Sequence, residues 1–102
     1  MNRQEAIQRL DDDGEHKFLL ENGPVYVVAI ARENDPHALL HEHLVRRMVD
    51  GGVFQSSDAV RGGYCRVLAG RLCWWGESSY PVRAANEKVF QSAVDENGIE
   101  LI

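Results

Sequence analysis

The sequence predicts an α+β fold: a small sandwich of one mixed or antiparallel sheet with two helices, in the order β-β-α-β-β-α-β. Short apolar runs rich in β-branched and aromatic residues are bounded by turn residues, which indicates strands. Two other segments carry apolar side chains at helical spacing, and strand pairs alternate with single helices. The 102 residues suffice for one domain with one modest core, so residues 1–102 are expected to form a single domain.

The first part of the chain reads as a strand pair. Residues 1–10 form either a short extra helix or a frayed end. Residues 16–20 are expected to be a strand, which could form a hairpin with the next strand through an Asn-Gly-Pro turn. That next strand, 25–30, is nearly all apolar and should lie centrally in the sheet, covered on both faces.

The segment 36–49 carries helix signals at both ends. Asp35 can cap the exposed backbone N–H groups, and Pro36 suits the first helical position. Gly51-Gly52 can end the helix. One side is apolar and is made of Leu40, Leu44, Val45, Met48 and Val49, with His37 and His41 inside the same stripe and Glu42, His43, Arg46 and Arg47 outside it. The helix therefore packs against the sheet and carries an imidazole into or beside the contact.

A second hairpin is expected over residues 64–75, after a loop-like segment at 51–63. With Ala69-Gly70 as its turn, Cys65 lies opposite Trp74, and the two cysteines point to opposite faces and cannot bridge. A bulge at the turn would reverse this parity. Residues 81–96 then predict a second helix with the apolar stripe Val82, Ala85, Val89, Phe90, Ala93 and Val94, followed by a last strand at 99–102.

Composition narrows the classes of function. The net charge is -5 and the pI about 5.3, which argues against nucleic acid or an anionic membrane as the main partner. No apolar run approaches the length that spans a bilayer, and the N-terminus lacks the apolar core of a signal peptide, so the expected location is cytoplasmic. Two cysteines make neither a disulfide framework nor a zinc site on their own.

Four pieces of the chain, in order, resemble the Janus/Ocnus family, which contains the protein histidine phosphatases. They are Asp13-Gly-Glu-His-Lys17-Phe18, His41 followed by Leu44-Val45, Arg66-Val67 after a glycine-containing loop, and Trp75-Gly-Glu-Ser78-Ser79-Tyr80. The resemblance implies the same small α+β sandwich, with His41 as general base for water attack on phosphohistidine and with Lys17, Arg66 and Ser78 holding the phosphoryl group. One departure stands out: where the family has three glycines directly before the arginine, this chain has Gly62-Gly63-Tyr64-Cys65, so that two of the three positions carry bulky residues.

The residues suit that chemistry. Phosphoryl transfer needs positioning and positive charge, which Lys17 and Arg66 would supply, while Ser78, Ser79 and the adjacent helix N-terminus would form an anion pocket. Neither a metal nor another cofactor is required. The expected substrate is a phosphorylated protein or a small phosphoramidate.

Other functions stay open. One alternative is a non-catalytic anion- or phosphopeptide-binding module of the same fold, which the altered glycine loop favours. A second is a metal site at His37 and His41, spaced i, i+4, with His16 or Cys73 as the third ligand. A third is a purely structural role, because a lone histidine in an apolar stripe is more often a hydrogen-bonded core residue, as serines before a helix are more often caps.

Overall fold

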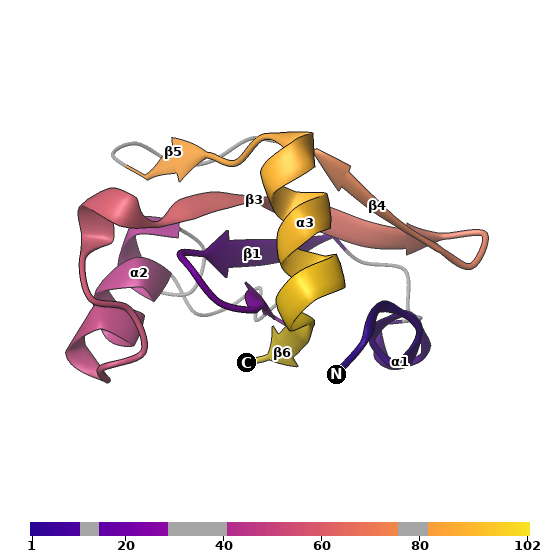
Figure 1. The fold of residues 1–102 in the computed structure, drawn as a ribbon, viewed down its shortest axis with the longest axis horizontal. Helices are drawn as coiled ribbons and strands as arrows, with labels where there is room; N and C mark the ends of the chain where they lie inside the picture. Colours follow the sequence, from indigo (N-terminus) through magenta and orange to yellow (C-terminus); the bar gives the residue numbers. More distant parts are fainter. Residues whose placement is uncertain (11–14, 29–40, 76–81) are drawn as a thin grey trace.

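The computed structural model describes residues 1–10, 15–28, 41–75 and 82–102. These ranges form a small α+β domain with a curled mixed sheet and three α-helices (Figure 1). The elements, in chain order, are α1 (Arg3–Arg9), β1 (His16–Leu20), β2 (Val25–Val27), α2 (His41–Asp50), the 3₁₀ helix η1 (Ser57–Ala59), β3 (Arg61–Leu68), β4 (Arg71–Trp75), β5 (Arg83–Ala84), α3 (Glu87–Asn97) and β6 (Ile99–Leu101).

Strand β1 lies in the middle of the sheet, whose order is β4-β3-β1-β2-β6, with β5 paired to β3. The pairs β1–β2, β1–β3 and β3–β4 are antiparallel, whereas β2–β6 and β3–β5 are parallel. The predicted hairpin of the first two strands is therefore confirmed. The strand expected at 25–30 does lie inside the sheet, between β1 and β6, and residues 29 and 30 fall outside the described ranges.

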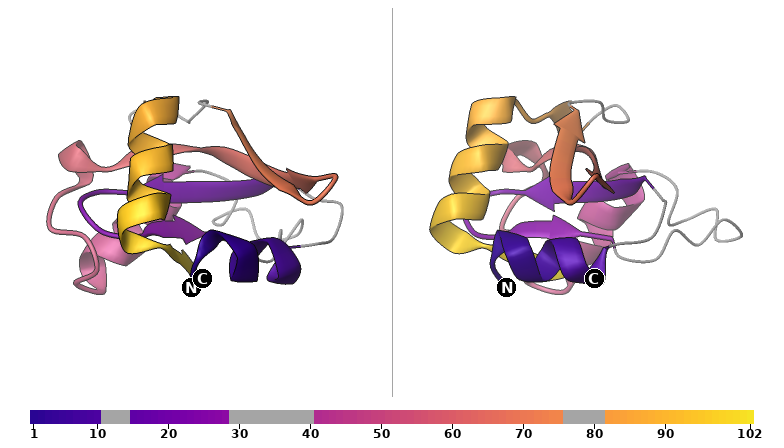
Figure 2. Two further views of the ribbon diagram at one scale, coloured as in Figure 1. Left: turned by 45° about the vertical axis from the view of Figure 1, so that its right-hand side comes forward. Right: turned by 90° about the vertical axis from the view of Figure 1, so that its right-hand side faces the viewer.

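Each face of the sheet packs against a different helix, because successive side chains of a strand point to opposite faces. Helices α1 and α3 cover one face, and α2 packs against the other, which we call the α2 face (Figure 2). The core under α1 and α3 contains Ala6, Leu10, Phe18, Leu20, Val25, Val27, Cys65, Leu72, Ala85, Phe90, Val94 and Ile99. The core on the α2 face contains Leu19, Leu44, Val45, Phe54, Val60 and Val82.

The β3–β4 hairpin has the register that the sequence predicts, with Cys65 opposite Trp74 and no bulge among the paired residues. Both turn residues lie in the left-handed region, Ala69 at φ 50° and Gly70 at φ 74°, as a two-residue turn between twisted strands requires. Cys65 is buried in the core under α1 and α3, and Cys73 lies on the other face. Both cysteines are free, as expected.

Two predicted boundaries are wrong. The second helix was expected at 81–96, but α3 begins at Glu87, because the Asn86 side chain accepts a hydrogen bond from the Val89 N–H at 2.8 Å and caps the helix there. Val82, expected on this helix, packs in the core of the α2 face instead. The segment 51–63 is not wholly loop, since η1 lies within it and β3 begins at Arg61.

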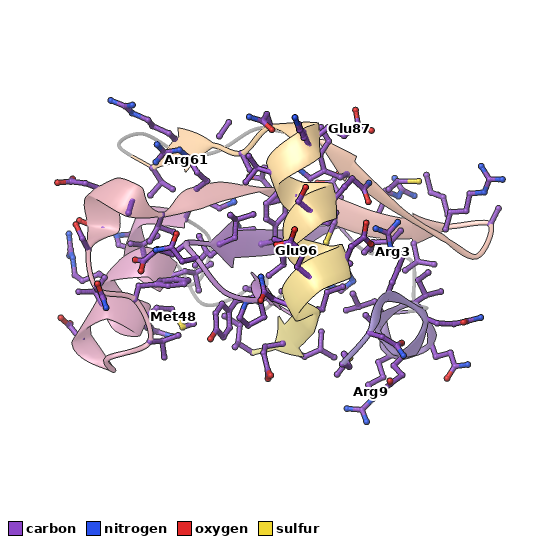
Figure 3. The ribbon with its side chains drawn as sticks, in the orientation of Figure 1. Arg3, Arg9, Met48, Arg61, Glu87 and Glu96 are labelled. Atoms are coloured by element: carbon purple, nitrogen blue, oxygen red, sulfur yellow. The ribbon has the colours of Figure 1, made fainter. Side chains whose placement is uncertain are left out.

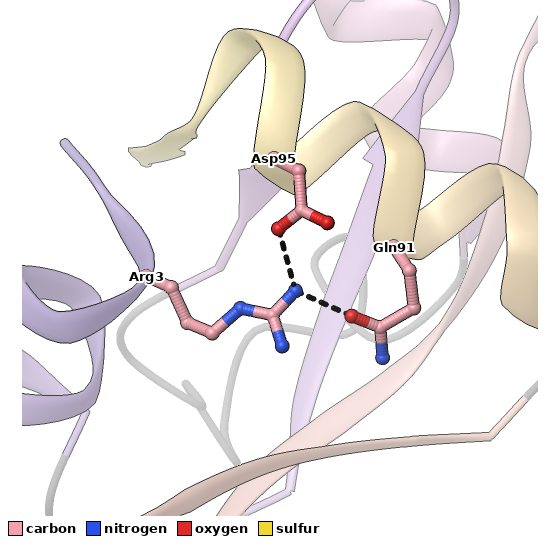
Figure 4. A network of polar contacts seen from close by, with 3 residues as sticks. All are labelled: Arg3, Gln91 and Asp95. Atoms are coloured by element: carbon pink, nitrogen blue, oxygen red, sulfur yellow. Dashed lines mark hydrogen bonds and ion pairs between the residues drawn. The ribbon is translucent and has the colours of Figure 1, made fainter.

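The two helices on the first face are joined by one polar network. Arg3 of α1 donates hydrogen bonds to Gln91 and, at 3.0 Å, to Asp95 of α3 (Figure 4). Arg9, one turn and a half further on, points away from the sheet (Figure 3). The short extra helix is thus the correct alternative for residues 1–10, and the Asn2 side chain caps it by accepting from Glu5 N–H.

Helix α2 ends at Asp50, one residue beyond the predicted 36–49, and the Gly51-Gly52 pair follows it, with Gly52 at φ 77°. Its expected first residues, 36–40, lie outside the described ranges. None of the helices in those ranges has the length and apolar character needed to cross a membrane.

Candidate functional site

His41 is the first described residue of α2, and its side chain is buried completely, with an exposed fraction of 0%. Leu44 and Val45 follow at i+3 and i+4, so they lie on the same side of the helix as His41. Both pack in the core of the α2 face with Leu19. The apolar stripe therefore carries the imidazole against the sheet, as the sequence predicts.

The two ring nitrogens of His41 have different environments. Nε2 lies 2.8 Å from the carbonyl oxygen of Gly63 on β3. A carbonyl can only accept, so Nε2 carries the proton and donates it. In the neutral ring Nδ1 then holds a lone pair, and this atom is buried without a hydrogen-bond partner in the described part of the chain. His41 thus has one nitrogen fixed by a hydrogen bond and one buried nitrogen that carries the lone pair.

The pKa of His41 is lowered from its ordinary value of 6.5. Burial is the largest cause, because a charged imidazolium loses its hydration there. The Gly63 carbonyl acts in the opposite direction, and the positive charge of Lys17 adds to the lowering. At neutral pH the ring is therefore unprotonated at Nδ1 and can accept a proton.

Lys17 and Tyr64 lie beside His41 on the α2 face. They are paired across β1 and β3. The Lys17 ammonium lies 5.9 Å from the centre of the Tyr64 ring, a cation–π contact. The Tyr64 and His41 rings meet edge to face, with centroids 5.1 Å apart and planes at 90°. Burial also lowers the pKa of Lys17 from 10.5.

Arg66 shares this face, because it lies two residues after Tyr64 on β3 and opposite Cys73 on β4. Its side chain is half-buried and makes no hydrogen bond or ion pair with the residues that the structure describes. Ser78 and Ser79 lie outside the described residues. The structure thus gathers His41, Lys17 and Arg66 on one side of the sheet.

The metal alternative loses one of its two possible third ligands, His16. His16 is register-paired with Cys65, which places it on the face opposite to His41. Its Nδ1 bonds the carbonyl oxygen of Val28 at 2.8 Å. Within the described ranges no group of three or more His, Cys, Asp or Glu side chains could hold a metal ion. His37 falls outside those ranges.

Sequence reasoning missed two features of this site. The Gly63 carbonyl, which fixes the imidazole, leaves no signal in side-chain identities. The burial of His16 on the other face was also missed, although its alternation with Phe18 and Leu20 along β1 could have indicated it. A hollow of about 220 Å³ beside α2, between that helix and η1, includes none of the expected site residues.

Comparison of the chain with models of known protein families, with curated proteins and with solved structures finds no match. Arguments about function therefore rest on the residues and their geometry.

Proposed function

We propose that this chain is a protein histidine phosphatase-like phosphohydrolase that acts on phosphohistidine or a related phosphoramidate. The observation that carries the proposal is the state of His41: a neutral ring held by the Gly63 carbonyl through Nε2, with Nδ1 free to accept a proton and a lysine close enough to lower its pKa. A fixed, unprotonated base beside cationic side chains is what water attack on a phosphoryl group requires.

In the proposed reaction, Lys17 and Arg66 bind the phosphoryl group and His41 transfers the proton. Lys17 and Arg66 bind the phosphoryl oxygens and offset the charge that they carry. Water forms the new P–O bond as its proton passes to Nδ1 of His41, and the P–N bond breaks. A proton then returns from His41 to the leaving nitrogen, so that the products are inorganic phosphate and free imidazole or amine. Ser78 and Ser79 are proposed to complete the anion pocket, without the helix N-terminus predicted beside them, because α3 begins only at Glu87.

Complete burial of His41 favours a second candidate, a non-catalytic anion- or phosphopeptide-binding module of the same fold. In the arrangement described, the imidazole has no surface exposed to water. Lys17 and Arg66, both only half-buried, are accessible to an anion without it. Such a module would bind phosphate at these two residues but would not hydrolyse a phosphorylated substrate.

The test is phosphate release from phosphoramidate and from phosphohistidine. We expect release by the wild-type protein and a loss of at least about 10²-fold in His41→Ala, the usual contribution of a general base. The matched control is His16→Ala. It removes a buried imidazole from the other face of the sheet, and that ring, like His41, makes one hydrogen bond to a backbone carbonyl. Its rate per folded molecule, with folding followed by circular dichroism, should equal that of the wild type.

Three results separate the candidates. Undiminished release by folded His41→Ala would reject His41 as the base. No release by the wild type, together with phosphate-dependent NMR shifts at Lys17 and Arg66, would favour the binding module. If the wild type shows neither phosphate release nor phosphate-dependent NMR shifts, both candidates are rejected.

A further inference from the structure

Strand β4 is the end strand of the sheet, and its outer edge has no partner in the described part of the chain. It pairs only with β3, and no backbone hydrogen bond from another described segment reaches it. The opposite end of the sheet differs. There Ile99 of β6 exchanges two backbone hydrogen bonds of 2.8 Å with Met1, which covers the outer edge of that strand.

The turn of the β3–β4 hairpin determines which backbone groups of β4 point to the outer edge. Residues that flank a two-residue turn exchange hydrogen bonds, and such pairs alternate along an antiparallel ladder. Arg71, which flanks the turn, and Cys73 therefore bond to β3. The N–H and C=O groups of Leu72 and Trp74 point the other way, to the outer edge.

This edge has few of the features that keep exposed strands from pairing. Natural edge strands are protected by charged residues, proline or bulges. In β4 the ladder is regular and contains no proline, and Arg71 at its start is the one charged residue. The four residues that follow are Leu-Cys-Trp-Trp. Such an edge favours pairing with a further strand.

We propose that the chain forms a dimer with a second copy of itself, through antiparallel pairing of the two β4 strands about a two-fold axis at Cys73. Leu72 of each copy then faces Trp74 of the other, so that all their outward backbone groups are paired. Arg71 faces position 75, so no two like charges meet. All five residues of β4 are used. The edge is thus complementary to itself, as a two-fold interface requires.

The dimer joins the two sheets into one. The axis runs perpendicular to the sheet, so the α2 faces of both copies become one continuous face. The paired residues Arg66 and Cys73 continue across the axis into the same row of the second copy. Lys17 and Arg66 of both copies therefore lie on one side of the dimer. The dimer goes beyond the phosphohydrolase function proposed above and does not depend on it.

Cys73 gives this register a chemical test. At the axis the two copies of Cys73 form a non-hydrogen-bonded pair, with Cα atoms about 4.5 Å apart, a separation that a disulfide can bridge. Cys73 is free and half-buried, whereas Cys65 is fully buried on the other face. Diamide takes two electrons and two protons from a pair of thiols, and it should join wild-type chains through Cys73. Cys73→Ser keeps Cys65 and should give no linked dimer.

Sedimentation under reducing conditions tests the dimer itself. We expect the wild type to approach twice the chain mass of 11.5 kDa as its concentration rises. Cys73→Lys and Cys73→Glu each place like charges opposite one another at the axis, and each should raise the dissociation constant at least about tenfold. A mixture of the two pairs opposite charges and should dimerise within about threefold of the wild type. Leu68→Lys is the control: it adds the same charge at an exposed position of β3 and should also stay within about threefold.

The outcomes are distinct. A wild type that stays monomeric at every concentration would overturn the proposal and leave the edge to a strand of another protein. Charged variants that dimerise as the wild type does, or a mixture that stays monomeric although circular dichroism shows both variants folded, would also overturn it. If the charged variants do not fold, the wild-type mass and the diamide products of wild type and Cys73→Ser decide.

Discussion

The buried imidazole of His41 should make the protein less stable as the pH falls. In the unfolded chain His41 takes up a proton near its ordinary pKa of 6.5, whereas in the folded protein burial lowers that pKa. Below pH 6.5 the unfolded state therefore binds more protons, and the free energy of unfolding falls with pH. The full stability is present above pH 6.5 and is lost progressively on the way down to the folded pKa.

The size of this pH effect on the free energy of unfolding is limited by the single proton that His41 binds. A single group changes the free energy of unfolding by at most about 1.4 kcal/mol per pH unit. Between pH 8 and pH 5.5, one unit below the ordinary pKa, His41 can thus account for up to about 1.4 kcal/mol. This is a large fraction of the 5–15 kcal/mol or so that holds a typical domain together. The Gly63 hydrogen bond, which favours the protonated ring, reduces the effect.

Urea unfolding of wild type and His41→Gln at pH 8 and at pH 5.5 measures this contribution. At pH 8 the variant should be less stable by about 1–3 kcal/mol, because it loses the fit of a buried hydrogen-bonding side chain. At pH 5.5 that difference should shrink by up to about 1.4 kcal/mol, since glutamine does not titrate. Carboxylates titrate in both proteins and cancel in the comparison. A difference that is the same at both pH values would refute the lowered pKa of His41.

Two further predictions concern the backbone. Gly98→Ala should lower the free energy of unfolding, measured in urea, by about 2 kcal/mol or more. The reason is that Gly98 has φ 80° and that an added Cβ would lie 2.5 Å from the carbonyl oxygen of Met1. Gly23→Ala is the control and should destabilise the protein far less, because no atom lies within 4 Å of its added Cβ. Ala69→Asn should raise the free energy of unfolding by about 0.5–1 kcal/mol and the melting temperature by several degrees. The reason is that Ala69 has φ 50° and that asparagine tolerates the left-handed region better than alanine. An unchanged or lower melting temperature would contradict this prediction.

Local patterns predicted the parity of the sheet correctly. In the β3–β4 hairpin the two-residue turn fixes which residues face each other, so Cys65 and Arg66 could be assigned to opposite faces from the sequence. That assignment puts Arg66 on the same face as Tyr64 and, through the β1–β3 pairing, as Lys17. Alternation along a strand is a short-range property and needs no knowledge of the rest of the fold.

Tertiary pairing overrode local signals elsewhere. Gly62 and Gly63 read as loop, yet they pair with Leu19 and Phe18 and extend β3 toward η1. Arg83 and Ala84 read as helix, yet they pair in parallel with the start of β3. A two-residue strand has no periodicity, and glycine has low strand propensity, so only the partner strand could have revealed either pairing.

The depth of His41 depends on the same unpredicted pairing. Gly62 belongs to the α2 face, between Val60 and Tyr64, and places no side chain there. The paired strand holds the Gly63 carbonyl and the Tyr64 ring against the imidazole. The tyrosine adds a ring contact to that hydrogen bond, and the spacing of residues along the helix predicts neither.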